Sequence, residues 1–257
     1  MTAAAIDRIV VVGGGIAGVS AASALRAGGY QGQLTLVDAG EFPYDRPPLS
    51  KDYLAGSKDL KQIALQPAEW YDDQNIGLRN LTTVAALRPS EGGVELGDGT
   101  VLAADRVILA TGGQAARPPI PGSDSDRVHI LRSSGDADNL RAQLVSGARV
   151  LVVGAGLIGA EVASTALDLG CVVTLVDPVP IPLAPAVGSD VAAWLHGLHG
   201  TRGVTTVLAG VDSFSSSNSG IAAHLSGESQ TRMFDVVVLG VGMVPETGLA
   251  AAAGLEV

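Results

Sequence analysis

Cysteine is almost absent from this 257-residue sequence, because Cys171 is the single one. One cysteine cannot form an internal disulfide, and it excludes a redox-active cysteine pair and a thiolate metal cluster. This usage is typical of a reducing cytosol, so we expect a cytoplasmic protein. Cys171 opens an apolar strand and is interpreted as a small core residue. Electrons that pass through such a chain need another carrier.

Positive charge and long hydrophobic runs are also scarce. Lys and Arg number 16 against 26 Asp and Glu, and the net charge of −10 argues against a nucleic-acid binder. The most apolar stretch, residues 9–25, is interrupted by glycines and serines, so we expect neither a signal peptide nor a membrane span. With 47% hydrophobic residues, the chain can still bury a core in one large or two modest domains.

The sequence does contain a repeated glycine-rich pattern. Residues 8–18 read RIVVVGGGIAG, and residues 149–159 read RVLVVGAGLIG. Each copy predicts an apolar strand, a glycine turn and a helix of small residues that ends at a second glycine stop. A second strand follows each helix and ends in an acid, Asp38 or Asp177. The repeat therefore predicts two βαβ units with parallel sheets.

The spacing of these glycines is typical of dinucleotide binding. In G-x-G-x-x-G the first glycine makes a tight turn, the second lets backbone approach a pyrophosphate, and the third lets helix and strand pack closely. The helix N-terminus favours the diphosphate, and the terminal acid can accept hydrogen bonds from ribose hydroxyls. One copy could be a plain glycine turn, but two complete copies predict two dinucleotides. Asp177 repels a 2′-phosphate and no arginine follows it nearby, so NADH is favoured over NADPH.

The remaining sequence predicts the elements around the two repeats. Residues 92–111 indicate a hairpin about Asp98-Gly99 and an apolar strand over 106–110. The prolines of residues 118–121 predict a stiff crossover, at which we place a domain boundary. Further on, we expect a helix over 189–199, strands over 204–240 with a polar turn at 215–220, and a short helix over 246–253.

Residues 43–54, PYDRPPLSKDYL, could by themselves be a proline-stiffened loop with solvated charges. They occur together with LATGG at 109–113, RPPIPG at 117–122, LR at 131–132 and VGMVP at 241–245. In these motifs the sequence resembles the FAD-dependent NADH:ferredoxin and rubredoxin reductases of bacterial oxygenase systems, a branch of the pyridine nucleotide-disulfide oxidoreductase superfamily. The resemblance covers about residues 6–257.

The resemblance implies an α/β fold with two Rossmann-like dinucleotide-binding domains, each three-layered with a parallel central sheet and an antiparallel β meander. The second domain is expected to be inserted in the first. The implied domains are an incomplete FAD-binding domain over 1–114, an NAD-binding domain over 115–242, and the start of the return to the FAD domain over 243–257.

The implied activity is electron transfer from NADH through FAD to a ferredoxin or rubredoxin of an oxygenase or P450 system. Lys51 and Glu161 are expected to be catalytic, as an ion pair whose lysine stabilises the reduced flavin ring near N5. Glu161 could instead be a solvated acid that suits the helix dipole. The cofactor-binding residues implied for FAD and NAD are Gly13, Gly15, Ile16, Ala17, Gly18, Asp38, Arg46, Lys51, Val84, Ala110, Thr111, Gly112, Arg132, Gly154, Gly156, Leu157, Ile158, Gly159, Glu161, Asp177, Val241 and Gly242.

Other candidate sites are weaker. His196 and His199 are three apart on a predicted helix, but no carboxylate or cysteine stands at metal-like spacing, so we interpret them as a surface pair and expect no metal. An acidic ferredoxin would need a local basic patch, for which Arg46, Lys51, Lys58 and Lys61 are candidates. The lack of a cysteine in the flavin domain favours electron transfer to a protein over thiol chemistry.

The sequence departs from the family pattern at two places. Pro185 stands where relatives usually carry an arginine after the second acid, so we expect weakened NADH affinity. The family's second FAD motif, Thr-x-x-x-x-Tyr-Ala-x-Gly-Asp, and its C-terminal domain are not in the sequence. We therefore expect either the N-terminal part of a reductase, completed by another chain, or a nucleotide-binding remnant with a regulatory role and no turnover. An exposed apolar sheet edge would favour a homodimer or a completing chain.

Overall fold

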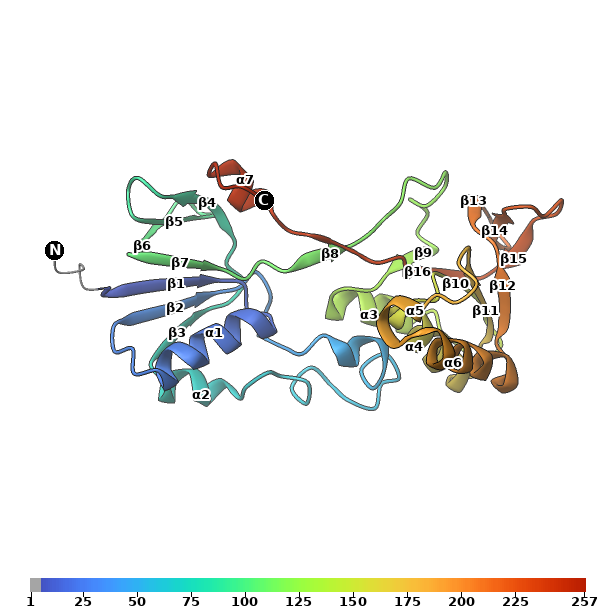
Figure 1. Ribbon diagram of the computed structural model, residues 1–257, viewed down its shortest axis with the longest axis horizontal. Helices are drawn as coiled ribbons and strands as arrows, with labels where there is room; N and C mark the ends of the chain where they lie inside the picture. Colours follow the sequence, from blue (N-terminus) through green and yellow to red (C-terminus); the bar gives the residue numbers. More distant parts are fainter. Residues whose placement is uncertain (1–5) are drawn as a thin grey trace. The chain divides into compact units, whose positions relative to one another are not determined.

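The computed structural model describes residues 6–257, which form two compact units (Figure 1). Unit 1 comprises the chain as far as Arg46, Leu60–Gln114 and Pro245–Val257, and unit 2 comprises Pro47–Asp59 and Ala115–Val244. Pro47–Asp59, called the crossing segment below, therefore belongs to unit 2, although the residues before and after it in the sequence belong to unit 1. None of the helices in the described part of the chain is long and apolar enough to cross a membrane.

Unit 1 has three layers. Its four-stranded parallel sheet has the order β3-β2-β1-β7, with helices on one face and a three-stranded antiparallel sheet, β4-β5-β6, on the other. The elements are β1 (Arg8–Val12), α1 (Ile16–Ala27), β2 (Gln33–Val37), α2 (Ala68–Asp73), β3 (Ile76–Arg79), β4 (Val84–Arg88), β5 (Gly93–Leu96), β6 (Val101–Ala103), β7 (Arg106–Leu109) and α7 (Gly248–Ala252).

The apolar run of β1 is buried on both faces. Ile9 and Val11 pack in the core cluster on the helix side, whereas Val10 and Val12 pack in the cluster that contains Val94 of the antiparallel sheet. Because successive side chains of a strand point to opposite faces, a strand between two layers must be apolar at every position. This explains why both repeats begin with an unbroken apolar run.

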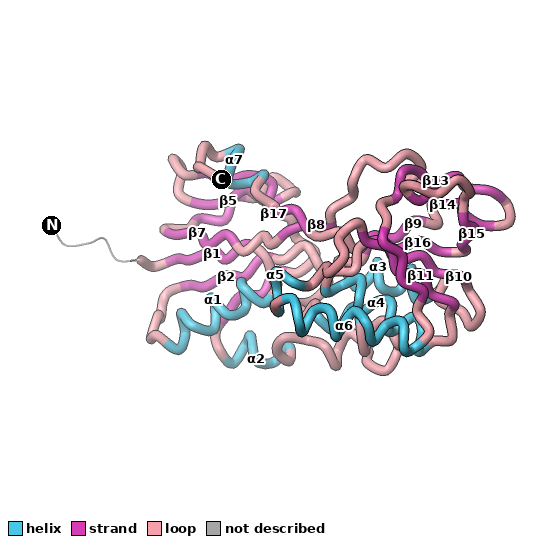
Figure 2. The backbone as a smooth tube through the Cα atoms, turned by 45° about the vertical axis from the view of Figure 1, so that its right-hand side comes forward, coloured by secondary structure: helices cyan, strands magenta, loops and turns pink. Residues whose placement is uncertain are grey.

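Unit 2 repeats the same arrangement. Its parallel sheet has the order β12-β11-β10-β16-β9, and the antiparallel sheet β13-β14-β15 packs against one face, with α4 and α6 on the other (Figure 2). The elements are η1 (Pro47–Ser50), β9 (Val128–Ile130), α3 (Ser134–Arg141), β10 (Arg149–Val153), α4 (Leu157–Asp168), β11 (Val172–Asp177), α5 (Ala184–Val187), α6 (Ser189–Arg202), β12 (Thr205–Leu208), β13 (Val211–Ser217), β14 (Gly220–Leu225), β15 (Arg232–Phe234) and β16 (Val236–Leu239). Two further strands, β8 (Gly113–Ala115) and β17 (Met243–Pro245), pair with each other.

The structure confirms the α/β fold class and both βαβ units, since β1 pairs with β2 and β10 with β11 in parallel. The polar turn predicted at 215–220 is wrong in its length. Ser215 to Ser217 belong to β13 and pair with residues 220–222 of β14, so that Asn218 and Ser219 alone form the turn. These serines are exposed at the end of β13, which is an edge strand of its sheet.

The two units also share a feature at the strands β7 and β16, which pair with β1 and β10 on the side away from β2 and β11. Asp105 directly precedes β7 and accepts hydrogen bonds from the Arg8 backbone N–H at 2.9 Å and its guanidinium at 3.2 Å. Asp235 directly precedes β16 and accepts from the Arg149 backbone N–H at 2.8 Å and its guanidinium Nη2 at 2.6 Å. In both parallel sheets, an arginine–aspartate pair therefore joins the amino ends of two neighbouring strands.

Candidate functional site

The first glycine turn joins β1 to α1, and backbone oxygens leave no room for a Cβ at two of its positions. A Cβ at Gly13, whose φ is +110°, would lie 2.2 Å from the Ala110 carbonyl oxygen, and one at Gly18 would lie 1.9 Å from the Gly13 carbonyl oxygen. A Cβ at Gly15 would meet no described atom within 4 Å. The turn is therefore tight on the sheet side and open at Gly15, the residue that begins α1 as its N-cap.

The second turn, between β10 and α4, has the same geometry. A Cβ at Gly159 would lie 1.8 Å from the Gly154 carbonyl oxygen, whereas one at Gly156 would again meet no described atom within 4 Å. Within residues 6–257, neither α1 nor α4 has a side-chain cap or an acidic residue in its first turn. Unfilled N–H groups in front of an open glycine suit an anion, so both turns fit the diphosphate of a dinucleotide.

The acids at the ends of the second strands are fixed by the glycine turns themselves. Asp38 Oδ1 accepts from the Gly14 backbone N–H at 3.0 Å, and Asp177 Oδ2 accepts from the Ala155 N–H at 2.8 Å. Asp177 accepts a second bond through Oδ1, from the Val179 N–H at 2.8 Å. Each carboxylate is therefore held beside its turn at the carboxyl end of the sheet, where ligands of α/β folds bind.

Tyr71 and His196 stand near these acids, a placement that the sequence interpretation did not predict. Burial chiefly, and then the charge of Asp38, raises the pKa of Tyr71 to about 12. The Tyr71 hydroxyl is buried without a hydrogen-bond partner in the described part of the chain. His196 lines a cavity of about 200 Å³ together with Asp177 and Leu208. A histidine one turn before a second histidine gives no sequence signal for contact with a strand end.

The structure brings Lys51 and Glu161 together within unit 2. Lys51 Nζ lies 2.9 Å from Glu161 Oε1, and the two side chains are 46% and 32% exposed. Ser50 Oγ donates to the other carboxylate oxygen at 2.5 Å, and Thr165 Oγ1 donates to the Ser50 carbonyl at 2.8 Å. Glu161 and Thr165 are one helical turn apart on α4, so the same face of α4 contacts both residues of the crossing segment.

The other expected site residues are divided between the units. Arg46, Val84 and the strand end at Ala110–Gly112 lie in unit 1, whereas Arg132, Val241 and Gly242 lie in unit 2. Thr111 Oγ1 donates to the Glu246 carbonyl at 2.7 Å, which ties that strand end to the last segment of unit 1. Lys58 of the expected basic patch lies 2.7 Å from Asp52, so its charge is partly neutralised.

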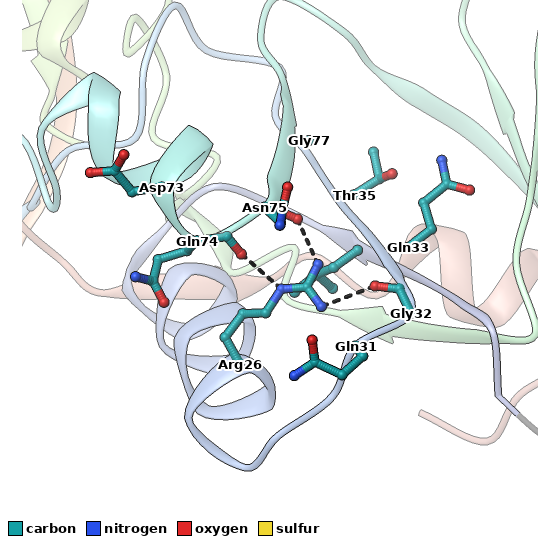
Figure 3. A pocket seen from close by; sticks show the side chains of 10 residues that line it. Arg26, Gln31, Gly32, Gln33, Thr35, Asp73, Gln74, Asn75 and Gly77 are labelled. Atoms are coloured by element: carbon teal, nitrogen blue, oxygen red, sulfur yellow. Dashed lines mark hydrogen bonds between the residues drawn. The ribbon is translucent and has the colours of Figure 1, made fainter.

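A cavity of about 590 Å³ lies at the opposite, amino end of the unit 1 sheet (Figure 3). Arg26 dominates it, and its guanidinium donates to the backbone carbonyls of Gln74, Asn75, Gly32 and Tyr30 at 2.6–2.9 Å. These bonds join the end of α1 to the start of β3. Arg26 therefore stabilises the fold of unit 1. The candidate site remains at the carboxyl ends of the strands.

His196 and His199 have ring centroids 6.2 Å apart on α6. Burial, His196 and Arg202 together lower the pKa of His199. Among residues 6–257, no group of three or more His, Cys, Asp or Glu side chains could hold a metal ion. Cys171 is buried, and its burial raises the pKa of the thiol.

Comparison with known proteins gives one consistent group. The model of the family described as pyridine nucleotide-disulphide oxidoreductase matches residues 7–257. Rhodocoxin reductase of Rhodococcus erythropolis is 38% identical over 97% of this chain and 59% of its own length. Putidaredoxin reductase of Pseudomonas putida is 37% identical over 98% of this chain and 61% of its own length.

Among solved structures, the covalent putidaredoxin reductase–putidaredoxin complex matches with a TM-score of 0.91 at 36% identity. That match covers 98% of this chain and 62% of the reductase chain. The ferredoxin reductase for the CYP199A2 system of Rhodopseudomonas palustris matches with a TM-score of 0.92 at 30% identity, over 98% and 62% of the two chains. This chain thus spans about three fifths of the length of the relatives it matches.

Proposed function

The chain belongs to the pyridine nucleotide-disulphide oxidoreductase family, and on that premise we propose that it passes electrons from NADH through FAD to a ferredoxin or rubredoxin of an oxygenase or P450 system. One observation carries the proposal: two glycine turns, in two separate units, are each open at the position where a diphosphate approaches a helix start. A chain with two dinucleotide sites can pair a nicotinamide donor with a flavin. The relatives with reductase names support the choice of acceptor.

Unit 1 is the proposed FAD-binding unit and unit 2 the proposed NAD-binding unit. The turns at Gly13–Gly18 and Gly154–Gly159 orient the two diphosphates, and the acids Asp38 and Asp177 accept hydrogen bonds from ribose hydroxyls. The additional FAD contacts are proposed for Arg46, Lys51, Val84, Ala110, Thr111, Gly112 and Arg132, and the additional NAD contacts for Leu157, Ile158, Glu161, Val241 and Gly242.

FAD, when bound, supplies the step between paired and single electrons, because it accepts a hydride and releases electrons one at a time. The protein supplies position and charge. Lys51 holds a positive charge in place, and Glu161, 2.9 Å away, balances that charge while no cofactor is near. Both carboxylate oxygens of Asp177 accept backbone hydrogen bonds, which hold this side chain in place. Its negative charge disfavours a 2′-phosphate.

The protein partner must dock on a chain whose net charge is −10. Lys51 and Lys58 both have carboxylate partners, so Arg46 and Lys61 are the stronger candidates for contact with an acidic ferredoxin. Cytoplasmic localisation is part of the proposal, because a single buried free cysteine suits a reducing compartment.

The test is whether the purified protein binds FAD and whether NADH bleaches it. We expect a yellow protein, or one that turns yellow with added FAD, whose visible flavin absorbance falls when NADH is added without oxygen. A ferredoxin or rubredoxin added afterwards should be reduced as the absorbance returns. A protein that takes up no FAD would contradict the proposal, and binding without bleaching would instead indicate a nucleotide-binding protein without turnover.

A further inference from the structure

Two buried residues with hydroxyl groups, Ser50 and Thr165, form hydrogen bonds beside the Lys51–Glu161 ion pair. Ser50 is 4% exposed and Thr165 is 8% exposed, although both are polar. The Ser50 hydroxyl has two acceptors, Glu161 Oε2 at 2.5 Å and the Pro47 carbonyl at 3.3 Å, and the carboxylate is much the nearer. Thr165 donates to the backbone carbonyl of Ser50 at 2.8 Å, and this bond is fully buried.

The ion pair by itself is a poor means of fixing a geometry. Its side chains are 46% and 32% exposed, and exposed ion pairs between long side chains contribute little and are screened by salt. Buried hydroxyls behave differently, because a buried donor without an acceptor is costly and so selects one arrangement. The order of this cluster must therefore come chiefly from Ser50 and Thr165.

The crossing segment is anchored a second time beyond these residues. Tyr53 Oη donates to Asp138 Oδ2 of α3 at 3.1 Å, and the Arg141 guanidinium lies 5.8 Å over the Tyr53 ring. Arg141 Nη1 also donates to the Tyr53 carbonyl at 3.4 Å. Lys51 thus lies on a short stretch of backbone that is held at Ser50 by α4 and at Tyr53 by α3.

We propose that Ser50 and Thr165 are positioning residues for Lys51. Thr165 fixes the Ser50 carbonyl, and with it the backbone from which Lys51 extends. The Ser50 hydroxyl occupies Glu161 Oε2, which leaves Oε1 as the oxygen that faces the ammonium group. The consequence for electron transfer rests on the proposed function, but the effect on Lys51 itself does not.

The first experiment measures the acylation rate of the Lys51 amine by an amine-reactive reagent in the cofactor-free protein, with peptide mass spectrometry. Ser50→Ala and Thr165→Val each remove one hydroxyl. We expect each to raise the Lys51 rate by about five-fold, the factor that loss of an ordinary hydrogen bond produces in an equilibrium. Lys58, which is 45% exposed and lies in the same segment, is the internal reference.

Three variants separate positioning from a general loss of structure. Thr165→Ser keeps the hydroxyl and should restore the wild-type rate. Ser57→Ala removes a serine of the same segment that bonds the Asp52 carbonyl, and Thr201→Val removes a threonine that bonds the Leu198 carbonyl in α6. Both controls should react as the wild type does. The two hydroxyl removals are independent, so if one variant does not fold, an unchanged Lys51 rate in the other overturns the proposal.

The second experiment separates this inference from the proposed function. In single-turnover reduction by NADH, Ser50→Ala and Thr165→Val should lower the limiting rate of flavin bleaching by about ten-fold while the half-saturating NADH concentration stays within about two-fold, as for a group that acts after binding. Thr165→Ser should restore the rate. If the wild type does not bleach, the proposed function fails and the Lys51 rates still decide the positioning inference. Unchanged Lys51 rates and unchanged bleaching in both variants would overturn the inference alone.

Discussion

The pKa of the Asp235 carboxylate is lowered by its pairing with Arg149. The carboxylate accepts three hydrogen bonds from Arg149, at 2.6–3.0 Å, and these bonds are the main cause that lowers its pKa to about 2. An unfolded aspartate titrates near pH 3.9. Between these two values the unfolded chain binds the extra proton, so stability from this group is complete above about pH 4 and is lost as pH falls toward 2.

We therefore predict that Asp235→Asn lowers the free energy of unfolding at pH 6 and that the deficit shrinks as pH falls from about 4 toward 2. The pair is partly exposed, at 43% and 36%, so solvent screening keeps the deficit well below that of a buried pair. Urea unfolding of both proteins at several pH values measures it. Asp124→Asn, in an exposed loop, is the matched control, and a deficit that does not change with pH would contradict the assignment.

At the scale of single elements, the two glycine turns allow a matched prediction. Gly159→Ala would put a Cβ 1.8 Å from a backbone oxygen, whereas Gly156→Ala would put one into open space. We expect Gly159→Ala to cost about 2 kcal/mol or more, as overpacking does, and to lower Tm by several degrees. Gly156→Ala should melt within about a degree of the wild type and instead weaken NAD binding about ten-fold, because its methyl group takes the space of the diphosphate.

Thermal unfolding and titration with NAD measure the two effects separately. The prediction is wrong if Gly156→Ala binds NAD normally, or if Gly159→Ala melts at the wild-type temperature. Gly197→Ala is the control, because Gly197 lies on α6 and a Cβ there would meet no described atom within 4 Å.

The sequence predicted those elements whose signals are local. Apolar runs, glycine turns and terminal acids identify both βαβ units, because each signal lies within about thirty residues of the next. The contact of Lys51 with Glu161 was expected only from the resemblance, and the contacts of Ser50 with α4 were not predicted, because they join residues 111 and 115 apart in sequence. The pairs of Asp105 and Asp235 were also missed, although an aspartate before each apolar strand, in DRVIL and DVVVL, was a readable signal.

At the scale of the whole molecule, the assignment of one dinucleotide to each unit remains a prediction. A ligand stabilises the part of the native state that it contacts, so amide hydrogen exchange should fall in the unit that binds it. We expect FAD to slow exchange in peptides that contain residues 13–18 and Asp38, and NAD to slow it in peptides that contain residues 154–159 and Asp177. Mass spectrometry of peptides from the protein with each ligand alone measures this.

The same exchange experiment also tests how the crossing segment is held. Residues 47–59 lie between two stretches of unit 1 in the sequence, yet their hydrogen bonds run to α3 and α4 of unit 2. In protein that carries no FAD, NAD bound at the start of α4 should therefore slow amide exchange in this segment. At an NAD concentration near the dissociation constant of the wild type, Gly156→Ala should reduce that response, because it weakens NAD binding at the start of the same helix. Lys51 is itself a proposed FAD contact, so a response of this segment to FAD does not decide the assignment. If residues 154–159 do not respond to NAD, or if both ligands protect one unit, then the two turns do not divide the dinucleotides as proposed.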